Sequence, residues 1–333
     1  MTGKDLDIDV VVPAFRCRAE LKACLEGLLD AGAPAERIIV VDDASGDDTP
    51  EAARAAGVQL IALDKNVGPA AARNRGVAAA TADLVLFVDA DVVVAGDVLD
   101  RVRAAFSADA GLSALFGAYD TKPAAPGRIS RIRNLLHHWN HDRAAGGAVT
   151  FWTGLGAVRH DAFDAVGGFD ETLDYMEDVD LGMRIWRQGG RIQIDPAIQG
   201  KHLKNWSFRS MMRTDFWGRA VPWSRLIMNG EFKDVPKTLN AGRRGQLSVI
   251  AVAVSVFALI LMPISAFFLA VVICAIGLIG WLHSGFLRLL KQVGEPGDRL
   301  AALGVLWLLY LTAGFGFVWV IYERVAGRVP NQA

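Results

Sequence analysis

The chain has 333 residues, 52% of them hydrophobic, and a formal net charge of -1. It is too apolar for an ordinary pair of soluble domains, and its near-neutral charge gives no global indication of nucleic-acid binding. The three cysteines, Cys17, Cys24 and Cys274, have no metal-binding spacing and indicate no disulfide framework, which suits a reducing compartment. Most of the apolar excess follows Gln246, whereas the first two thirds alternate charged and apolar segments.

The N-terminal part predicts alternating strands and helices. Residues 1–9 are polar and acidic and do not read as a signal peptide. We expect strands at 8–12, 37–41, 58–63 and 84–88, separated by helices at 18–30, 49–56 and 69–80. This order predicts an α/β fold with a doubly wound parallel sheet. The first strand is followed neither by G-x-x-x-x-G-K nor by G-x-G-x-x-G, which disfavours NTPases and dinucleotide oxidoreductases.

Carboxylates follow two of these strands. The apolar run 84–88 ends in Asp89-Ala90-Asp91, and the strand 37–41 ends in Asp42-Asp43. Ligands of open α/β sheets gather at the carboxyl ends of strands, where alternate carboxylates can hold a divalent cation. Aspartate also favours turns and helix N-caps, so Asp-x-Asp taken alone supports a metal site and an ordinary turn about equally.

The middle of the chain contains a second group of polar residues. We expect a helix at 129–143 containing His137, His138 and His141, which we interpret as a surface that faces a substrate or an interface. A strand at 148–151 is expected to precede Trp152 and Gly154. A helix at 177–188 begins with Glu177, Asp178 and Asp180, and a strand at 191–194 is followed by a turn at Asp195-Pro196 and then by His202. Acidic residues favour a helix N-terminus, which explains only part of this cluster.

Together these motifs resemble the family-two glycosyltransferases of GT-A fold. The resemblance rests on residues 11–15, 40–47, 66–76 and 89–91, which are similar to the nucleotide-sugar motifs, and on 166–171 with 177–181, which are similar to the acceptor-side signature. It covers about residues 8–205. The sequence departs from the family at Arg16, near which the family usually shows Asn.

The resemblance implies a role for each motif. Residues that surround the nucleotide would be Pro13, Phe15, Asp42, Asp43, Arg73, Asp89 and Ala90. The metal, Mn²⁺ or Mg²⁺, would be held by Asp89, Asp91 and His202. Asp178 would be the catalytic base of an inverting transfer, assisted by Glu177. The acceptor or sugar side would include Trp152, Gly154, Asp180, Arg213 and Trp217.

The C-terminal third predicts a membrane attachment. Residues 206–245 mix basic and aromatic side chains, which is typical of a helix at the headgroup level, so nucleic-acid binding is not expected there. Three transmembrane helices are expected within 246–323, at about 247–264, 266–287 and 300–322, followed by a tail at 324–333. A buried soluble hairpin is the alternative. Flanking arginine and lysine residues place residues 1–245 in the cytoplasm and the C-terminus across the inner membrane.

These features predict a GT-A catalytic domain at 1–205 that is a metal-dependent, inverting, single-sugar transferase. The donor would be a nucleotide-sugar, with UDP expected, and the acceptor a hydroxyl of a membrane lipid or a lipid-linked molecule. The absence of Gln-x-x-Arg-Trp after the base disfavours processive polymer synthesis. The alternatives are transfer to a polyprenyl phosphate, a nucleotidyltransferase, and a membrane scaffold without turnover.

Overall fold

The computed structural model describes residues 6–233, 235 and 242–328. The chain forms two compact units. Unit 1 comprises residues 1–125 and 140–204, and unit 2 comprises residues 126–139 and 205–333. The helix α5 (Arg128–Arg143) therefore contributes its first twelve residues to unit 2 and the remainder to unit 1.

The described part of unit 1 is built on one sheet of nine strands. The strands are β1 (Ile8–Ala14), β2 (Ile38–Asp42), β3 (Gln59–Ala62), β4 (Leu84–Val88), β5 (Val92–Val94), β6 (Leu112–Tyr119), β7 (Gly146–Ala148), β8 (Leu155–Arg159) and β9 (Arg191–His202). Their order is β3-β2-β1-β4-β8-β6-β9-β5, and β7 pairs with β9. The connecting elements are α1 (Arg18–Asp30), η1 (Ala35–Arg37), α2 (Thr49–Ala56), α3 (Pro69–Ala79), α4 (Val98–Ala108), α6 (His160–Ala165) and α7 (Glu177–Arg187).

Only half of this sheet is parallel. β1 pairs in parallel with β2 and β4, and β2 with β3, as the β-α-β pattern predicts. β8 is antiparallel to both β4 and β6, and β5 and β7 are antiparallel to β9. The expectation of an α/β fold is confirmed, but a wholly parallel doubly wound sheet is wrong. β5, α4, β6, α5 and β7 lie between β4 and β8 in the chain, so no single β-α-β unit joins the two strands and requires them to be parallel.

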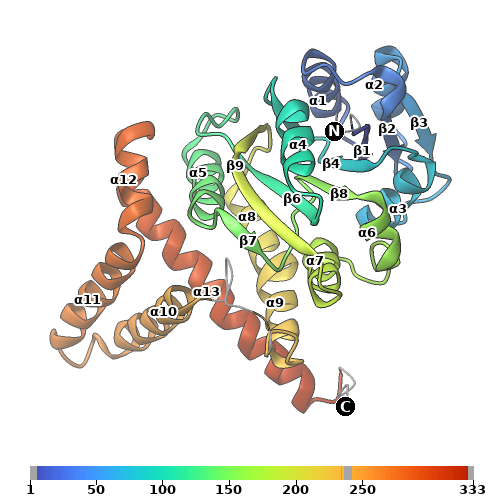
Figure 1. Ribbon diagram of the computed structural model, residues 1–333. Coiled ribbons are helices and arrows are strands. Elements are labelled where there is room, and N and C mark those ends of the chain that lie inside the picture. Colours follow the sequence, from blue (N-terminus) through green and yellow to red (C-terminus); the bar gives the residue numbers. More distant parts are fainter. Residues whose placement is uncertain (1–5, 234, 236–241, 329–333) are drawn as a thin grey trace. The chain divides into compact units, whose positions relative to one another are not determined.

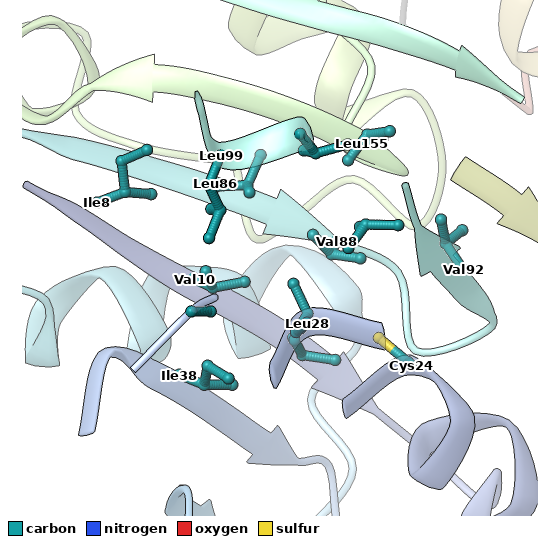
Figure 2. Packing of buried hydrophobic residues seen from close by; sticks show 14 of the residues in the cluster. Ile8, Val10, Cys24, Leu28, Ile38, Leu86, Val88, Val92, Leu99 and Leu155 are labelled. Carbon is teal, nitrogen blue, oxygen red and sulfur yellow. The ribbon is translucent and has the colours of Figure 1, made fainter. Parts of the chain in front are cut away.

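The core of unit 1 lies between the parallel strands and the helices that cover them. Figure 2 shows Val10 of β1, Leu86 of β4 and Leu28 of α1, which belong to one cluster of buried hydrophobic residues. All five residues of β4 are buried, as expected for a strand covered on both faces. Because the strand is fixed along its whole length, the direction in which the chain leaves Val88 is fixed as well.

Two local expectations differ from the structure. The strand expected at 148–151 ends at Ala148. The expected turn at Asp195-Pro196 is instead part of β9, whose pairing with β6 jumps from Phe116↔Ile194 to Ala118↔Gln199. Proline lacks an N–H, which is tolerated where a bulge interrupts the ladder. The strand thereby continues to His202, which pairs with Val92 of β5.

The C-terminal part of unit 2 is helical. Its helices are α8 (Phe208–Asp215), η2 (Phe216–Ala220), α9 (Val221–Met228), α10 (Arg243–Leu261), α11 (Phe267–Leu282), α12 (Ser284–Val293) and α13 (Asp298–Val325). The single helix expected at 266–287 breaks at His283, and α11 and α12 meet with a bend of 71°. Among the described residues, α10 and α13 are long and apolar enough to cross a membrane, with a third span only if α11 and α12 count as one.

An apolar hollow of about 660 Å³ lies in unit 2, between the α8–η2 segment and α13. Its lining residues are Met212, Phe216, Leu311, Thr312, Phe315, Val318, Trp319 and Tyr322. In the same unit, α8, η2 and α9 run beside the second half of α13 (Figure 1). Before α10, the described residues of the segment 206–245 are mainly helical, and α8, η2 and α9 pack against α13. Lys237, one of the basic residues of this segment, lies outside the described residues.

Candidate active site

The ends of β1, β2 and β4 bring the predicted carboxylates to one edge of the sheet. Ala14 pairs with Asp42 in the β1–β2 register, and Phe87 of β4 pairs with Val11 of β1. Parallel neighbouring strands end at the same edge, so Asp42, Asp43 and Asp89 follow from strand order alone. The backbone N–H of Asp89 donates to the carbonyl of Gly154 at 3.2 Å, which places the predicted sugar-side loop beside this strand end.

A buried arginine links this edge to α7. Arg73 of α3 donates through Nη2 to Asp89 Oδ1 at 2.8 Å and through Nη1 to Glu177 Oε1 at 2.7 Å. Its side chain is only 6% exposed. Charge-assisted pairs of this kind are short and hold geometry well. Arg73 therefore ties the end of β4 to the start of α7, where the sequence predicts the catalytic base.

Asp178 is partly buried next to this bridge. Burial is the main cause that raises its pKa from 3.8 to about 7, and the charge of Glu177 adds to the rise while Arg73 opposes it. A carboxyl group with a pKa near neutrality is suited to take a proton from a hydroxyl. Met176, just before the helix, has a φ of +67°, a conformation that strains a residue other than glycine.

Asp91 and His202 face each other. His202 Nε2 lies 3.3 Å from Asp91 Oδ2, and its ring stacks on Tyr119 with centroids 4.3 Å apart. Burial by itself would raise the pKa of Asp91, but the hydrogen bond and charge of His202, with the charge of Lys204, lower it. The bulged strand β9 is what brings His202 to this position.

The structure also contains a chain of aromatic contacts that begins at His202 and that the sequence did not predict. Tyr119 meets Trp152 edge to face at 5.0 Å, and Trp152 meets His141 in the same way at 4.8 Å. His141 is buried and its Nδ1 lies 2.9 Å from the carbonyl of Gly117, so the expectation that it forms part of a surface is wrong. A Cβ atom at Gly154 would collide with the Trp152 indole, which explains the glycine there.

Asp42 and Asp43 each accept hydrogen bonds from the loop that leads into a helix, α2 for Asp42 and α3 for Asp43. The Ser45 hydroxyl donates to Asp42, and Asp43 accepts the backbone N–H groups of Val67 at 2.7 Å and Gly68 at 2.9 Å. Both aspartates are buried. These contacts shape the loops at the starts of α2 and α3 and leave further lone pairs on the carboxylates for a ligand.

Pro13 lies near the end of β1, and Phe15 follows it with 44% of its surface exposed. Arg16 adopts a φ of +51° and stacks its guanidinium 5.0 Å from the Phe15 ring. Asparagine enters this left-handed conformation more readily than arginine. Arg16 compensates with hydrogen bonds to the hydroxyl and the carbonyl of Ser45, at 2.9 and 3.0 Å.

Three other predicted residues make local contacts of their own. Asp180 pairs with Arg184 one helical turn later, at 2.6 Å. Arg213 and Trp217 belong to unit 2, where Trp217 packs on Phe216 and Trp319. Their expected roles on the acceptor or sugar side stay predictions.

Two of the three residues expected to hold the metal lie close together. Among the residues that the structure describes, no group of three or more His, Cys, Asp or Glu side chains converges on a possible ion position. Asp91 and His202 converge, whereas one oxygen of Asp89 is engaged with Arg73. One carboxylate and one imidazole fit Mn²⁺ or Mg²⁺ when phosphate oxygens and water complete the coordination.

Comparison with known proteins agrees with this geometry. Residues 9–166 match the family Glycosyl transferase family 2. This segment, just under half of the chain, is therefore similar to a family 2 glycosyltransferase domain. The match covers β1 from its second residue to β4, Arg73, the Asp-x-Asp end of β4 and the Trp152 loop, and it ends before α7.

Curated relatives of this glycosyltransferase domain are named for sugar transfer or polysaccharide synthesis. A pre-mycofactocin glycosyltransferase of Mycobacterium tuberculosis is 28% identical over 258 residues, covering 71% of this chain and 51% of the relative. The succinoglycan biosynthesis protein ExoA of Rhizobium meliloti is 29% identical over 201 residues, covering 55% of this chain and 59% of the relative. The chain thus spans about half the length of the first of these relatives.

The fold of the domain is that of a solved GT-A enzyme. A mannosyltransferase from Pyrobaculum calidifontis, in complex with GDP-Man and Mn²⁺, superposes with a TM-score of 0.56 at 18% identity. The superposition covers 95% of this chain and 88% of that chain. The expected GT-A fold is confirmed.

Proposed function

We propose that this chain is an inverting, metal-dependent glycosyltransferase that moves one sugar from a nucleotide-sugar to a hydroxyl of a lipid or lipid-linked acceptor. The observation that carries the proposal is the Arg73 bridge, which holds the Asp-x-Asp strand end against the helix that begins with Glu177 and Asp178. Beside this bridge, burial raises the pKa of Asp178 to about 7, which favours an enzyme over a scaffold without turnover.

Asp178 acts as the base in this reaction. Its carboxylate accepts the proton of the acceptor hydroxyl while that oxygen forms a bond to the anomeric carbon of the donor. The bond from that carbon to the diphosphate breaks, and a nucleoside diphosphate leaves. Attack opposite the leaving group inverts the anomeric centre. Glu177 stays paired with Arg73 and supports the position and the raised pKa of Asp178.

Asp91 and His202, together with Asp89, would hold Mn²⁺ or Mg²⁺. The bound ion supplies positive charge that neutralises the leaving diphosphate. The remaining donor contacts would come from Pro13, Phe15, Asp42 and Asp43. The exposed ring of Phe15 suits packing against a base, and a free lone pair of an Asp carboxylate suits a ring N–H such as that of uracil.

The acceptor is proposed to carry a hydrocarbon tail. The apolar hollow of unit 2 supports this, because its lining is almost entirely hydrocarbon and aromatic. We place the enzyme at a bacterial-type inner membrane with unit 1 in the cytoplasm. A retained base favours a hydroxyl acceptor over a polyprenyl phosphate, which is already ionised at neutral pH and needs no deprotonation.

The test incubates the full chain with a panel of nucleotide-sugars, Mn²⁺ and extracted membrane lipids. Release of nucleoside diphosphate with a glycosylated lipid product supports the proposal, and release of pyrophosphate would indicate a nucleotidyltransferase instead. Excess EDTA should abolish turnover, and Asp91→Asn should lower the rate by several powers of ten, about the contribution expected of a catalytic metal. Full activity in EDTA would remove the metal from the proposal.

A further inference from the structure

The helix α13 has 28 residues and is long and apolar enough to cross a membrane, with a mean hydropathy of 1.9 over an 18-residue window. Its contacts inside unit 2 point to a different arrangement. Both ends of α13 form ion pairs with segments that precede the first candidate span, α10. The side of the membrane on which those segments lie therefore decides where the two ends of α13 lie.

The first residue of α13 is held by two arginines. Asp298 is completely buried and accepts hydrogen bonds from Arg131 Nε at 2.6 Å, Arg131 Nη2 at 3.0 Å and Arg128 Nε at 3.2 Å. Arg131 also pairs with Glu295 at 2.9 Å. Both arginines belong to the first half of α5, within unit 2.

The last turns of α13 are held by α9. Glu323 pairs with Arg225 at 3.0 Å and accepts a hydrogen bond from Trp319 Nε1 at 2.8 Å. Packing between these segments is close, since a Cβ atom added at Gly316 would lie 2.6 Å from the Ala220 Cβ. The contact is continuous over several turns, as the course of α8, η2 and α9 beside α13 also shows (Figure 1).

The distance between the two ion pairs shows whether α13 can cross the membrane. Asp298 and Glu323 are 25 residues apart, which corresponds to about 37 Å of helix. The hydrocarbon core is about 30 Å thick, so a crossing α13 would place the two pairs on opposite sides of it. The chain from Arg131 to Arg225 lies wholly within the described residues and contains no candidate span. Its two contact points therefore lie on the same side.

The α8–η2–α9 segment cannot accompany α13 through the bilayer. It contains five ionisable residues, namely Arg209, Arg213, Asp215, Arg219 and Arg225. Charged side chains within the hydrocarbon are strongly disfavoured, and this segment does not qualify as a span. The charges instead suit the headgroups of an anionic leaflet.

We propose that α13 lies along the face of the membrane that carries the rest of the chain, as an in-plane anchor, and that only the α10–α11 hairpin enters the bilayer. The hairpin exposes large apolar side chains near its tip, including Ile260, Ile264 and Phe267. Arginines stand at both ends of α13, with Arg299 at the start and Arg328 beyond the end. The positive-inside rule then favours the same side for both. This arrangement differs from the three crossings expected from hydropathy.

The test introduces one accessible cysteine at a time into the full chain, with Cys17 and Cys274 replaced by serine and the buried Cys24 kept as the background control. Arg299→Cys and Arg328→Cys report the two ends of α13, and Glu26→Cys on the exposed face of α1 reports the side of unit 1. A membrane-impermeant maleimide is applied to sealed vesicles of each orientation. We expect all three cysteines to react in one orientation and none in the other. Reaction of the two α13 cysteines in opposite orientations would overturn the proposal.

A second measurement does not depend on thiol accessibility. Alkaline phosphatase, which is active only outside the cytoplasm, is fused after Ala333 and, as a control, ahead of Met1. We expect both fusions to be inactive, and the corresponding green fluorescent protein fusions to be fluorescent. An active phosphatase at the C-terminus alone would show that α13 crosses. Neither readout depends on sugar transfer, so the topology can fail while the proposed function stands.

Discussion

Replacing Asp178 with asparagine tests the base with little change in shape. The amide cannot accept a proton from the acceptor hydroxyl, so the transfer rate should fall at least about a hundredfold, within the usual range for a lost general base. The residues proposed to contact the donor lie outside α7, so the affinity for the nucleotide-sugar should remain nearly unchanged. Rapid-quench measurement of transfer, with donor binding followed by calorimetry, separates the two effects.

The pH profile gives an independent magnitude. The pKa of Asp178 is raised to about 7, so its carboxylate is the form that burial disfavours and that catalysis requires. With that pKa, about one tenth of the groups are ionised at pH 6 and about nine tenths at pH 8, so kcat/KM should fall roughly tenfold on acidification. This fall of kcat/KM on acidification should be absent from the residual activity of Asp178→Asn.

The stability of the same variant checks the cause. A carboxyl group whose folded pKa exceeds its unfolded value of 3.8 destabilises the fold as pH rises above 3.8, up to the folded pKa of about 7. At pH 8, Asp178→Asn should therefore be more stable than the parent and unfold at a higher temperature. The gain in the free energy of unfolding should be at most about 4 kcal/mol. The exposed Asp174→Asn serves as the matched control and should change neither rate nor stability. The assignment of Asp178 as the base would be refuted if Asp178→Asn transferred sugar at the parental rate. It would also be refuted if kcat/KM of this variant still fell on acidification.

Three further outcomes are expected. Arg73→Met should lower the free energy of unfolding by about 3–5 kcal/mol, because it leaves buried Glu177 unpaired. The control Arg75→Met breaks an exposed pair with Glu171 and should lower it by only about 0–1 kcal/mol. Equal losses in chemical denaturation would contradict the Arg73 bridge. His202→Ala should raise the Mn²⁺ concentration needed for half-maximal donor binding by at least about tenfold, and an unchanged titration would exclude a ligand role. Phe315→Arg, in the apolar hollow, should impair transfer to a lipid acceptor but leave donor hydrolysis at the parental rate, and equal loss of both would argue against an acceptor tail there.

Much of unit 1 follows from local sequence. Buried apolar runs such as 84–88 become strands because no other conformation of so short a run buries both faces, and carboxylates that follow them must gather at one edge of a parallel sheet. The resemblance to family 2 glycosyltransferases was carried by these strand ends, and the family match confirms it.

Local sequence misleads where pairing partners decide the outcome. Asp195-Pro196 has the composition of a turn, yet the neighbouring strand β6 offers a ladder that accepts the proline at a bulge, and β9 continues to His202. The break of the helix at His283 was likewise not visible in an apolar run that hydropathy treats as one span.

The sequence by itself determined the parallel half of the sheet, the edge at which Asp42, Asp43 and Asp89 meet, and the helix that begins with Glu177 and Asp178. Only the tertiary structure decided that Arg73 joins Asp89 to Glu177, although 104 residues separate Arg73 from that glutamate. It also decided that burial sets the pKa of Asp178. Strand ends follow from short-range patterns of hydrophobicity, whereas ion pairs and burial depend on which distant segments the fold brings together.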